Sequence, residues 1–301
     1  MDHQSAFHVS ETRPVAIVPR RSLTVQACWR SALAVTCSTV ILLILLMVLG
    51  QAALPARAAS AIWFVVQGQS GSCTQSSPCG TIQQAVDRAS NGDEIRVAQG
   101  TYTDWNTRTV GPVVTQTVFL SKPLTLRGGY TTTDWVSSFP LTRPTTLDAQ
   151  GWHLVIYIAA DAMATVEGFN VTNGSSDQGG GIYIAGGNSV IRSMTIYSNT
   201  ASQDGGGVYV AGGNPTVQNS DIHTNTASNN GGGIYVAGGN PVVQDNQIDN
   251  NSAPGTDAAQ GGGGIYVAGG NVEILRNSIY SNTTSRSGAG IHIWSTGLIT
   301  V

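Results

Sequence analysis

The sequence has few charged residues and almost no lysine. Asp, Glu, Lys and Arg make up 10% of the 301 residues, and Lys122 is the only lysine. After residue 58, 9 Lys and Arg stand against 15 Asp and Glu, which gives a formal charge of −6. Since this charge leaves no basic patch, we do not expect a nucleic-acid partner.

Charge is absent altogether between residues 31 and 56, and the centre of this run, "VILLILLMVLG", is strongly apolar. Arginines precede the run, and "ARAASA" with its small-residue pair Ala56 and Ala58 follows it, which is typical of a secretory signal. The run is also long enough to cross a bilayer uncleaved. We therefore expect residues 1–58 to be a signal sequence or a signal anchor. The domain of residues 59–301 is then secreted or attached to the cell envelope, and it meets the membrane only through an uncleaved segment.

Cysteine and histidine are scarce, with four and five residues. Beyond the targeting segment only Cys73 and Cys79 remain, in "SCTQSSPCG". No histidine lies near them to complete a metal site. A close pair in an exported protein favours a small disulfide loop. We expect a Cys73–Cys79 disulfide, no metal and no cofactor.

Glycine is abundant, with 37 residues, and much of it lies in one repeated phrase. "GGGIYVAGGN" occupies 231–240 and again 262–271, with near-copies from 179 and 205. A fixed period of 26 residues, extended once by five residues after Asn251, predicts a stack of coils with one bulging loop. Alternating apolar residues predict short strands in each coil. The segment 82–89 is the one predicted helix, and we expect it to cap the first strand.

Two motif pairs resemble known families. "GGGI" occurs together with "IYSN", "IHTN" and "IDNN", and this pairing resembles the GGxI and FxxN pairs of polymorphic outer-membrane protein repeats, with Ile in place of Phe. "TTLDAQG" and "TVEGFNVTNG" resemble coils of secreted bacterial right-handed parallel β-helix proteins of the pectin-lyase-like superfamily. The resemblance covers residues 62–301. It implies an all-β, right-handed parallel β-helix, a solenoid with a short N-terminal capping helix and regular repeats from about 173 to 301.

The repeats place asparagine and glycine at recurring bends. Stacked asparagines hydrogen-bond to each other and to turn backbone. We expect a structural ladder of Asn173, Asn199, Asn225, Asn251 and Asn282. Each glycine cluster is followed by Ile-Tyr or Val-Tyr, so the acidic ligand of a calcium-binding β-roll is missing, and the clusters are interpreted as tight bends.

An aromatic column is expected on the outer face of the repeats. It consists of Tyr183, Tyr209, Tyr235 and Tyr266, with His292 at the fifth coil. Such a stripe has two interpretations: it binds a ligand, either sugar rings or another protein, or it stabilises the sheet through aromatic contacts. We take these five residues as the candidate ligand-binding set.

Candidate catalytic residues lie on a second outer column and beside it. They are Asp221, His223, Asp245 and Asp249. A His and an Asp one coil apart suit general base catalysis, although a solvated pair is the alternative. Two acids suit a glycoside hydrolase, but Arg276 is placed to neutralise Asp245. The resemblance implies that a lyase of this superfamily needs a basic residue, and the repeats offer no lysine.

The columns stay monotonous along the repeats, and this favours a non-catalytic role. We expect a cell-surface or extracellular protein for adhesion, glycan contact or structural spacing, with a polysaccharide or another surface protein as its partner. The alternative is a carbohydrate-active enzyme, either a polysaccharide lyase or a glycoside hydrolase. The final segment "GAGIHIWSTGLITV" begins a coil without a polar cap, so we expect either a fragment of a longer protein or a pairing surface.

Overall fold

A computed structural model describes residues 60–257 and 260–301. The predicted signal segment lies outside the described residues. Among the described residues, no helix has the length and apolarity needed to cross a membrane.

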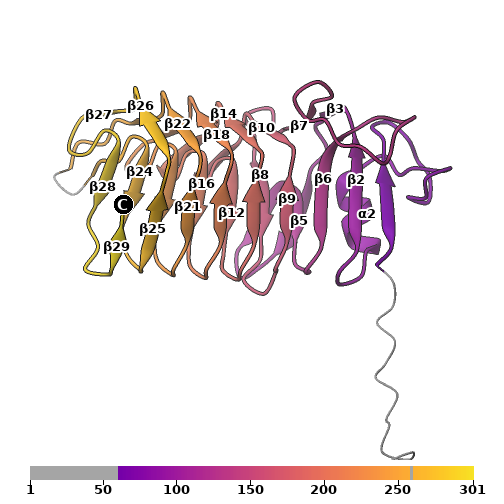
Figure 1. Ribbon diagram of the computed structural model, residues 1–301, viewed down its shortest axis with the longest axis horizontal. Helices are drawn as coiled ribbons and strands as arrows, with labels where there is room; N and C mark the ends of the chain where they lie inside the picture. Colours follow the sequence, from indigo (N-terminus) through magenta and orange to yellow (C-terminus); the bar gives the residue numbers. More distant parts are fainter. Residues whose placement is uncertain (1–59, 258–259) are drawn as a thin grey trace, which may run out of the picture. The chain divides into compact units, whose positions relative to one another are not determined.

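From β8 (Leu154–Ile158) to β27 (Thr283–Thr284), each coil of the chain crosses four sheets in turn. In one coil, β12 (Ile182–Ile184) is followed by β13 (Val190–Arg192), β14 (Thr195–Tyr197) and β15 (Thr200–Asp204). The chain then returns to β16 (Val208–Val210), which pairs in parallel with β12. Figure 1 shows these coils following one another along the sequence from the indigo end to the yellow end. The predicted right-handed parallel β-helix is confirmed.

The strands of the described residues form four sheets, in which each strand is hydrogen-bonded to the next. The nine-stranded sheet contains β1 (Ile62–Val65), β2 (Glu94–Ala98), β6 (Thr125–Tyr130), β9 (Thr165–Glu167), β13, β17 (Thr216–Gln218), β21 (Val242–Gln244), β25 (Val272–Leu275) and β29 (Ile299–Thr300). The eight-stranded sheet contains β28 (Ile291–Ile293), β24 (Ile265–Val267), β20 (Ile234–Val236), β16, β12, β8 (Leu154–Ile158), β5 (Val113–Leu120) and β4 (Asn106–Thr109). The seven-stranded sheet contains β26 (Ser278–Tyr280), β22 (Gln247–Asp249), β18 (Asp221–His223), β14, β10 (Asn170–Thr172), β7 (Thr145–Asp148) and β3 (Gly100–Tyr102). The five-stranded sheet contains β11 (Ser175–Gln178), β15, β19 (Thr226–Ala227), β23 (Ser252–Ala253) and β27 (Thr283–Thr284).

The main core is one continuous cluster of mostly aliphatic side chains inside the coils. In β20 the side chains of Ile234 and Val236 are fully buried, whereas Tyr235 between them points outward. Val243 and Ile248 are also fully buried. The predicted period-2 alternation is therefore confirmed in strands such as β20 and β21.

The inserted loop leaves the strand register intact. Ile234 pairs with Ile265 and Ile248 pairs with Ile279, both across 31 residues, whereas Ile222 pairs with Ile248 across 26. The five extra residues follow β23, so they lengthen one connection without shifting the neighbouring coils.

The helix α2 (Ile82–Arg88) caps the first coil, as predicted. Thr81 is its N-cap, and the Thr81 hydroxyl accepts a hydrogen bond from the backbone N–H of Gln84. Ile82 and Val86 on its buried face join the apolar core. The helix therefore covers apolar side chains that the first coil would otherwise expose to water.

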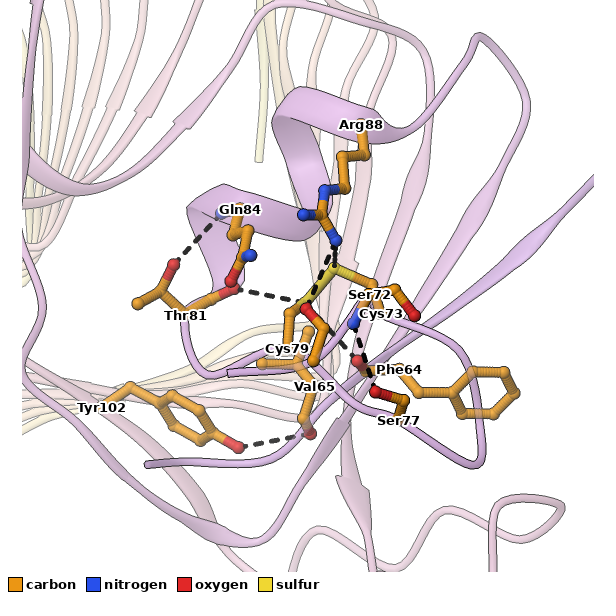
Figure 2. Close-up of a disulfide and its surroundings, with 11 residues drawn as sticks. Phe64, Val65, Ser72, Cys73, Ser77, Cys79, Thr81, Gln84, Arg88 and Tyr102 are labelled. Carbon is orange, nitrogen blue, oxygen red and sulfur yellow. Dashed lines mark hydrogen bonds between the residues drawn. A yellow bond between two sulfur atoms is a disulfide. The ribbon is translucent and has the colours of Figure 1, made fainter. Parts of the chain in front are cut away.

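Cys73 and Cys79 form the predicted disulfide beside α2, with Cα atoms 4.3 Å apart. Figure 2 shows the bridge under the Arg88 side chain, whose Nη1 donates to the Cys73 sulfur at 3.2 Å. The backbone of Phe64 bonds to both ends of the loop, donating to Cys73 O and accepting from Cys79 N. The disulfide thus holds a short loop against β1 at the capped end.

Candidate functional site

A buried amide ladder runs through the corner between the seven- and five-stranded sheets. It contains Asn199, Asn225, Asn251 and Asn282, which are at most 8% exposed. Each side-chain Oδ1 from Asn225 onward accepts from the Nδ2 and from the backbone N–H of the asparagine in the preceding coil, at 2.9–3.1 Å. Asn199 ends the chain of bonds by accepting from the backbone N–H of Gly174. The ladder satisfies buried backbone groups, which is a structural role.

The inclusion of Asn173 in this ladder was wrong. Val171 pairs with Ile196, so this coil is 25 residues long and the ladder position falls on Gly174. Asn173 is exposed instead, with a left-handed backbone (φ 53°), and its Nδ2 donates to Asp148. A second ladder, which sequence reasoning missed, contains Ser220, Asn246 and Asn277.

The predicted aromatic column is formed, and it is longer than predicted. Tyr157 and Phe119 extend it beyond Tyr183. From Phe119 to Tyr266, neighbouring rings lie 5.1–5.4 Å apart with interplanar angles of 7–17°. His292 continues the column at a 45° tilt.

This stacking restricts how the column can meet a ligand. The two faces of Tyr209 lie against Tyr183 and Tyr235, so its ring is not a platform for a sugar. Tyr209 is 8% exposed and Tyr266 is 3% exposed. In the middle of the column only ring edges remain for contact, which favours the sheet-stabilising interpretation. A binding role for the five predicted residues stays a prediction.

Burial raises the pKa of tyrosines in the aromatic column. Burial, with the charges of Tyr183 and Asp204, raises the pKa of Tyr209 to about 12, and burial raises the pKa of Tyr183. The folded state therefore favours the neutral phenol. This preference is fully present below pH ~10, the ordinary pKa of tyrosine, and is lost as the pH rises through the folded pKa values.

We expect the free energy of unfolding to fall as the pH rises from about 10 towards 12. Tyr209→Phe removes one titrating group, so the variant should match the wild type at neutral pH and lose less stability in alkali. Denaturant titrations at a series of pH values measure this difference. If both proteins lost the same free energy of unfolding in alkali, the raised pKa of Tyr209 would not contribute to the pH dependence.

The N-terminal end of the column opens into a groove, which we call the aromatic groove. Its volume is about 490 Å³. Trp152, 84% exposed, lines it together with Tyr157 and Tyr183. The β4–β5 hairpin, which is antiparallel, forms one wall, and β11 forms another with Ser175, Ser176, Asp177 and Gln178. An exposed indole beside hydroxyl and carboxylate groups suits a ligand with an apolar face and hydroxyl donors.

Sequence reasoning missed Trp152 and Tyr157 as site residues. Tyr157 lies 26 residues before Tyr183, so the repeat period itself carried the signal. Trp152 stands in a turn outside the repeated phrase, and no spacing marks it.

The structure places His223 and Asp249 opposite each other in neighbouring strands but does not join them. His223 stacks on Tyr197, and its Nδ1 lies 3.0 Å from the Thr224 hydroxyl. The Asp249 oxygens accept from Gln247 and Asn250. The candidate general-base pair is therefore not hydrogen-bonded, and Asp249 is not the solvated neighbour of the alternative either, because it is 6% exposed.

Asp221 and Asp245 come together in a different groove of about 1030 Å³, which we call the corner groove. Burial raises the pKa of Asp221, while the hydrogen bonds from Arg276 hold the pKa of Asp245 below its usual range. Arg276 binds Asp245 in a two-pronged ion pair, with both N···O distances 2.7 Å, as the sequence predicted. Both oxygens of Asp245 are therefore already bonded to Arg276.

Comparison with known proteins identifies the family. The family described as right-handed beta helix region matches residues 150–301, so the chain belongs to this family. A solved structure that it resembles, a crystal structure of pectate lyase Pel9A, shows 17% identity and a TM-score of 0.47. The match covers 77% of this chain and 58% of that one, so the chain spans less than two thirds of that structure. No curated protein sequence matches.

Proposed function

We propose that the protein is an exported β-helix module that binds extracellular polysaccharide without cleaving it. The observation that carries this proposal is Trp152, a large apolar ring 84% exposed at the mouth of the aromatic groove. Trp152 is not one of the stacked rings of the column, and its ring is largely open to solvent. Indole rings pack against the apolar faces of sugar rings, and groups such as Ser175 and Asp177 suit their hydroxyls.

The titratable groups of the aromatic groove argue for binding over catalysis. Among the residues that line it, Asp177 is the one carboxylate, and it accepts from the Ser202 hydroxyl at 2.7 Å. His153 is 8% exposed, and its Nδ1 lies 2.9 Å from the carbonyl oxygen of Leu154. Glycoside hydrolysis requires two carboxyl groups, one on each side of the scissile bond.

Export is the second part of the proposal. Residues 1–58 have the composition of a signal sequence or signal anchor. The disulfide of Cys73 and Cys79 adds support, because such bridges persist in oxidising compartments outside the cytosol. A partner on the cell surface or in the surrounding matrix is consistent with this location.

The enzyme alternative has one observation in its favour. Asp221 and Asp245 line the same groove and their pKa values shift in opposite directions, which is typical of acid and base pairs. The ion pair with Arg276 weighs against it, because both Asp245 oxygens are already hydrogen-bonded. Binding is the function that the geometry supports better.

A glycan array with the purified protein tests the proposal. We expect Trp152→Ala to lower the affinity for the bound glycan at least about tenfold, because aromatic anchors carry much of the energy at binding sites. Trp294→Ala is the matched control, since Trp294 is 61% exposed and does not line the aromatic groove, and it should bind like the wild type. Absence of any glycan binding would contradict the proposed function. Equal binding by Trp152→Ala would contradict the proposed site.

A further inference from the structure

The corner groove lies on a different part of the coils from the aromatic groove. Its floor is built from successive coils around the turn between the nine- and seven-stranded sheets, with Asn170, Thr195, Asp221 and Gln247 at one register position. One wall is the segment 138–144. Four neighbouring strands at about 4.8 Å spacing give a floor about 14 Å long, which suits a linear ligand lying along the axis.

Asp221 is an unsatisfied acceptor in this floor. Its Oδ1 is buried and has no hydrogen-bond partner among the described residues. Burial raises its pKa, and the nearby charges of His223 and Asp249 act in opposite directions on it. A buried acceptor without a donor costs about 1–3 kcal/mol. If the carboxylate turns towards the groove, a donor from a ligand there removes this cost.

The wall of the groove is apolar and fixed in place. Leu141 is 94% exposed and Phe139 is 49% exposed, so both present apolar surface to the groove. The Phe139 backbone N–H donates to Gly129 O at 2.9 Å, and the Arg143 guanidinium lies over the Phe139 ring at 4.8 Å. Arg143 is held in turn by an ion pair with Asp134. The wall is therefore anchored to the β-helix on more than one side.

The charges of the corner groove select against acidic ligands. Among the residues that line it there is no lysine, arginine or histidine. Arg276, the one cation bonded to a lining carboxylate, is taken up by Asp245. Arg143, which lies over the Phe139 ring in the wall, is paired with Asp134. A carboxylate on the ligand would thus meet Asp221 without an unpaired guanidinium beside it, which is unfavourable.

We infer that the corner groove is a second saccharide-binding site, for sugars that carry hydroxyl or amine donors and no carboxylate. A donor of the sugar bonds to the Asp221 carboxylate, which turns towards the groove to meet it, while the apolar face of the sugar ring packs against Leu141 and Phe139. The selectivity is opposite to that of a site for polyuronate, which needs positive charge. The inference does not depend on the aromatic groove.

Calorimetric titration of the full chain tests this site. The Trp152→Ala variant is the background, so that binding at the aromatic groove does not contribute. The probes are neutral β-glucan and xylan oligosaccharides, a glucosamine oligomer and an oligogalacturonate. We expect at least one neutral or amine-bearing probe to bind and the oligogalacturonate not to bind. Binding through an ammonium donor should weaken with added salt, whereas binding through hydroxyl donors should not.

Two variants assign the binding to the corner groove. Asp221→Asn should lower the affinity at least about tenfold and leave the thermal midpoint equal or higher, because it removes a buried carboxylate. Leu141→Ala should weaken binding several-fold without unfolding, since Leu141 is almost fully exposed. Asp161→Asn, an exposed carboxylate outside the groove, is the control and should bind normally. The inference is overturned if no neutral or amine-bearing probe binds, if both groove variants bind like the background, or if oligogalacturonate binding depends on Asp221.

Discussion

Asn225→Ala should lower the free energy of unfolding by about 3–5 kcal/mol. The Asn225 side chain is fully buried, and its Nδ2 donates to Ile196 O at 2.8 Å and to Asn251 Oδ1 at 3.0 Å. Its Oδ1 accepts from both the backbone N–H and the Nδ2 of Asn199. Alanine removes all four bonds. The backbone N–H of Asn199 is then left buried without an acceptor, which is the costly case.

The chain supplies a matched control for this prediction. Asn214 belongs to an exposed ladder with the same spacing of 26 residues, where each Nδ2 donates to the Oδ1 of the preceding coil. Because water replaces these bonds, Asn214→Ala should change stability by less than about 1 kcal/mol. Denaturant unfolding followed by circular dichroism measures both variants. If both variants lost a similar free energy of unfolding, burial would not be what makes the asparagine ladder stabilising.

Gly206→Ala should cost at least about 3 kcal/mol or prevent folding. A Cβ on Gly206 would lie 2.5 Å from Thr226 O and 2.6 Å from Gly232 O, both backbone atoms of the next coil. No side chain can rotate away to make room, so the two coils would have to separate. This close approach explains why the repeated phrase keeps glycine at its second position.

Gly212→Ala is the comparison within the same repeat. The nearest atom to a Cβ there is Ala185 O at 4.0 Å, an ordinary contact. Alanine also reduces the freedom of the unfolded chain, so stability should stay within about 1 kcal/mol of the wild type. Thermal unfolding compares the midpoints of both variants with that of the wild type. A folded Gly206→Ala protein with a wild-type midpoint would refute the packing argument.

The fold could be predicted from the sequence because the same residue types recur at fixed positions in each coil, and few other structures fit that pattern. The period of 26, the alternation of Ile234 and Val236, and the cap at Thr81 each correspond to a feature that the structure contains. Asn173 shows where period alone fails, because one coil is shorter by a residue and a column read by spacing then slips by one position.

The sites were harder to predict than the fold. The orientation of the Tyr209 ring depends on its neighbours in three dimensions, so the sequence predicted a column but not that its faces are closed. Trp152 and Leu141 lie in segments outside the repeats, and both grooves arise where such segments meet the coils. The repeats predict the stacked coils, whereas the two grooves form where irregular segments pack against the coils, and no spacing in the sequence predicts them.

Product analysis of the bound glycan tests the central claim, binding without cleavage, most directly. The protein is incubated with the polysaccharide that it binds most tightly, and the chain length and end groups of the recovered glycan are determined. We expect the polysaccharide to be recovered at its original length, with no new reducing ends and no unsaturated sugars. Shortened or unsaturated products that disappear in Asp221→Asn or Asp245→Asn protein would show that the protein is an enzyme.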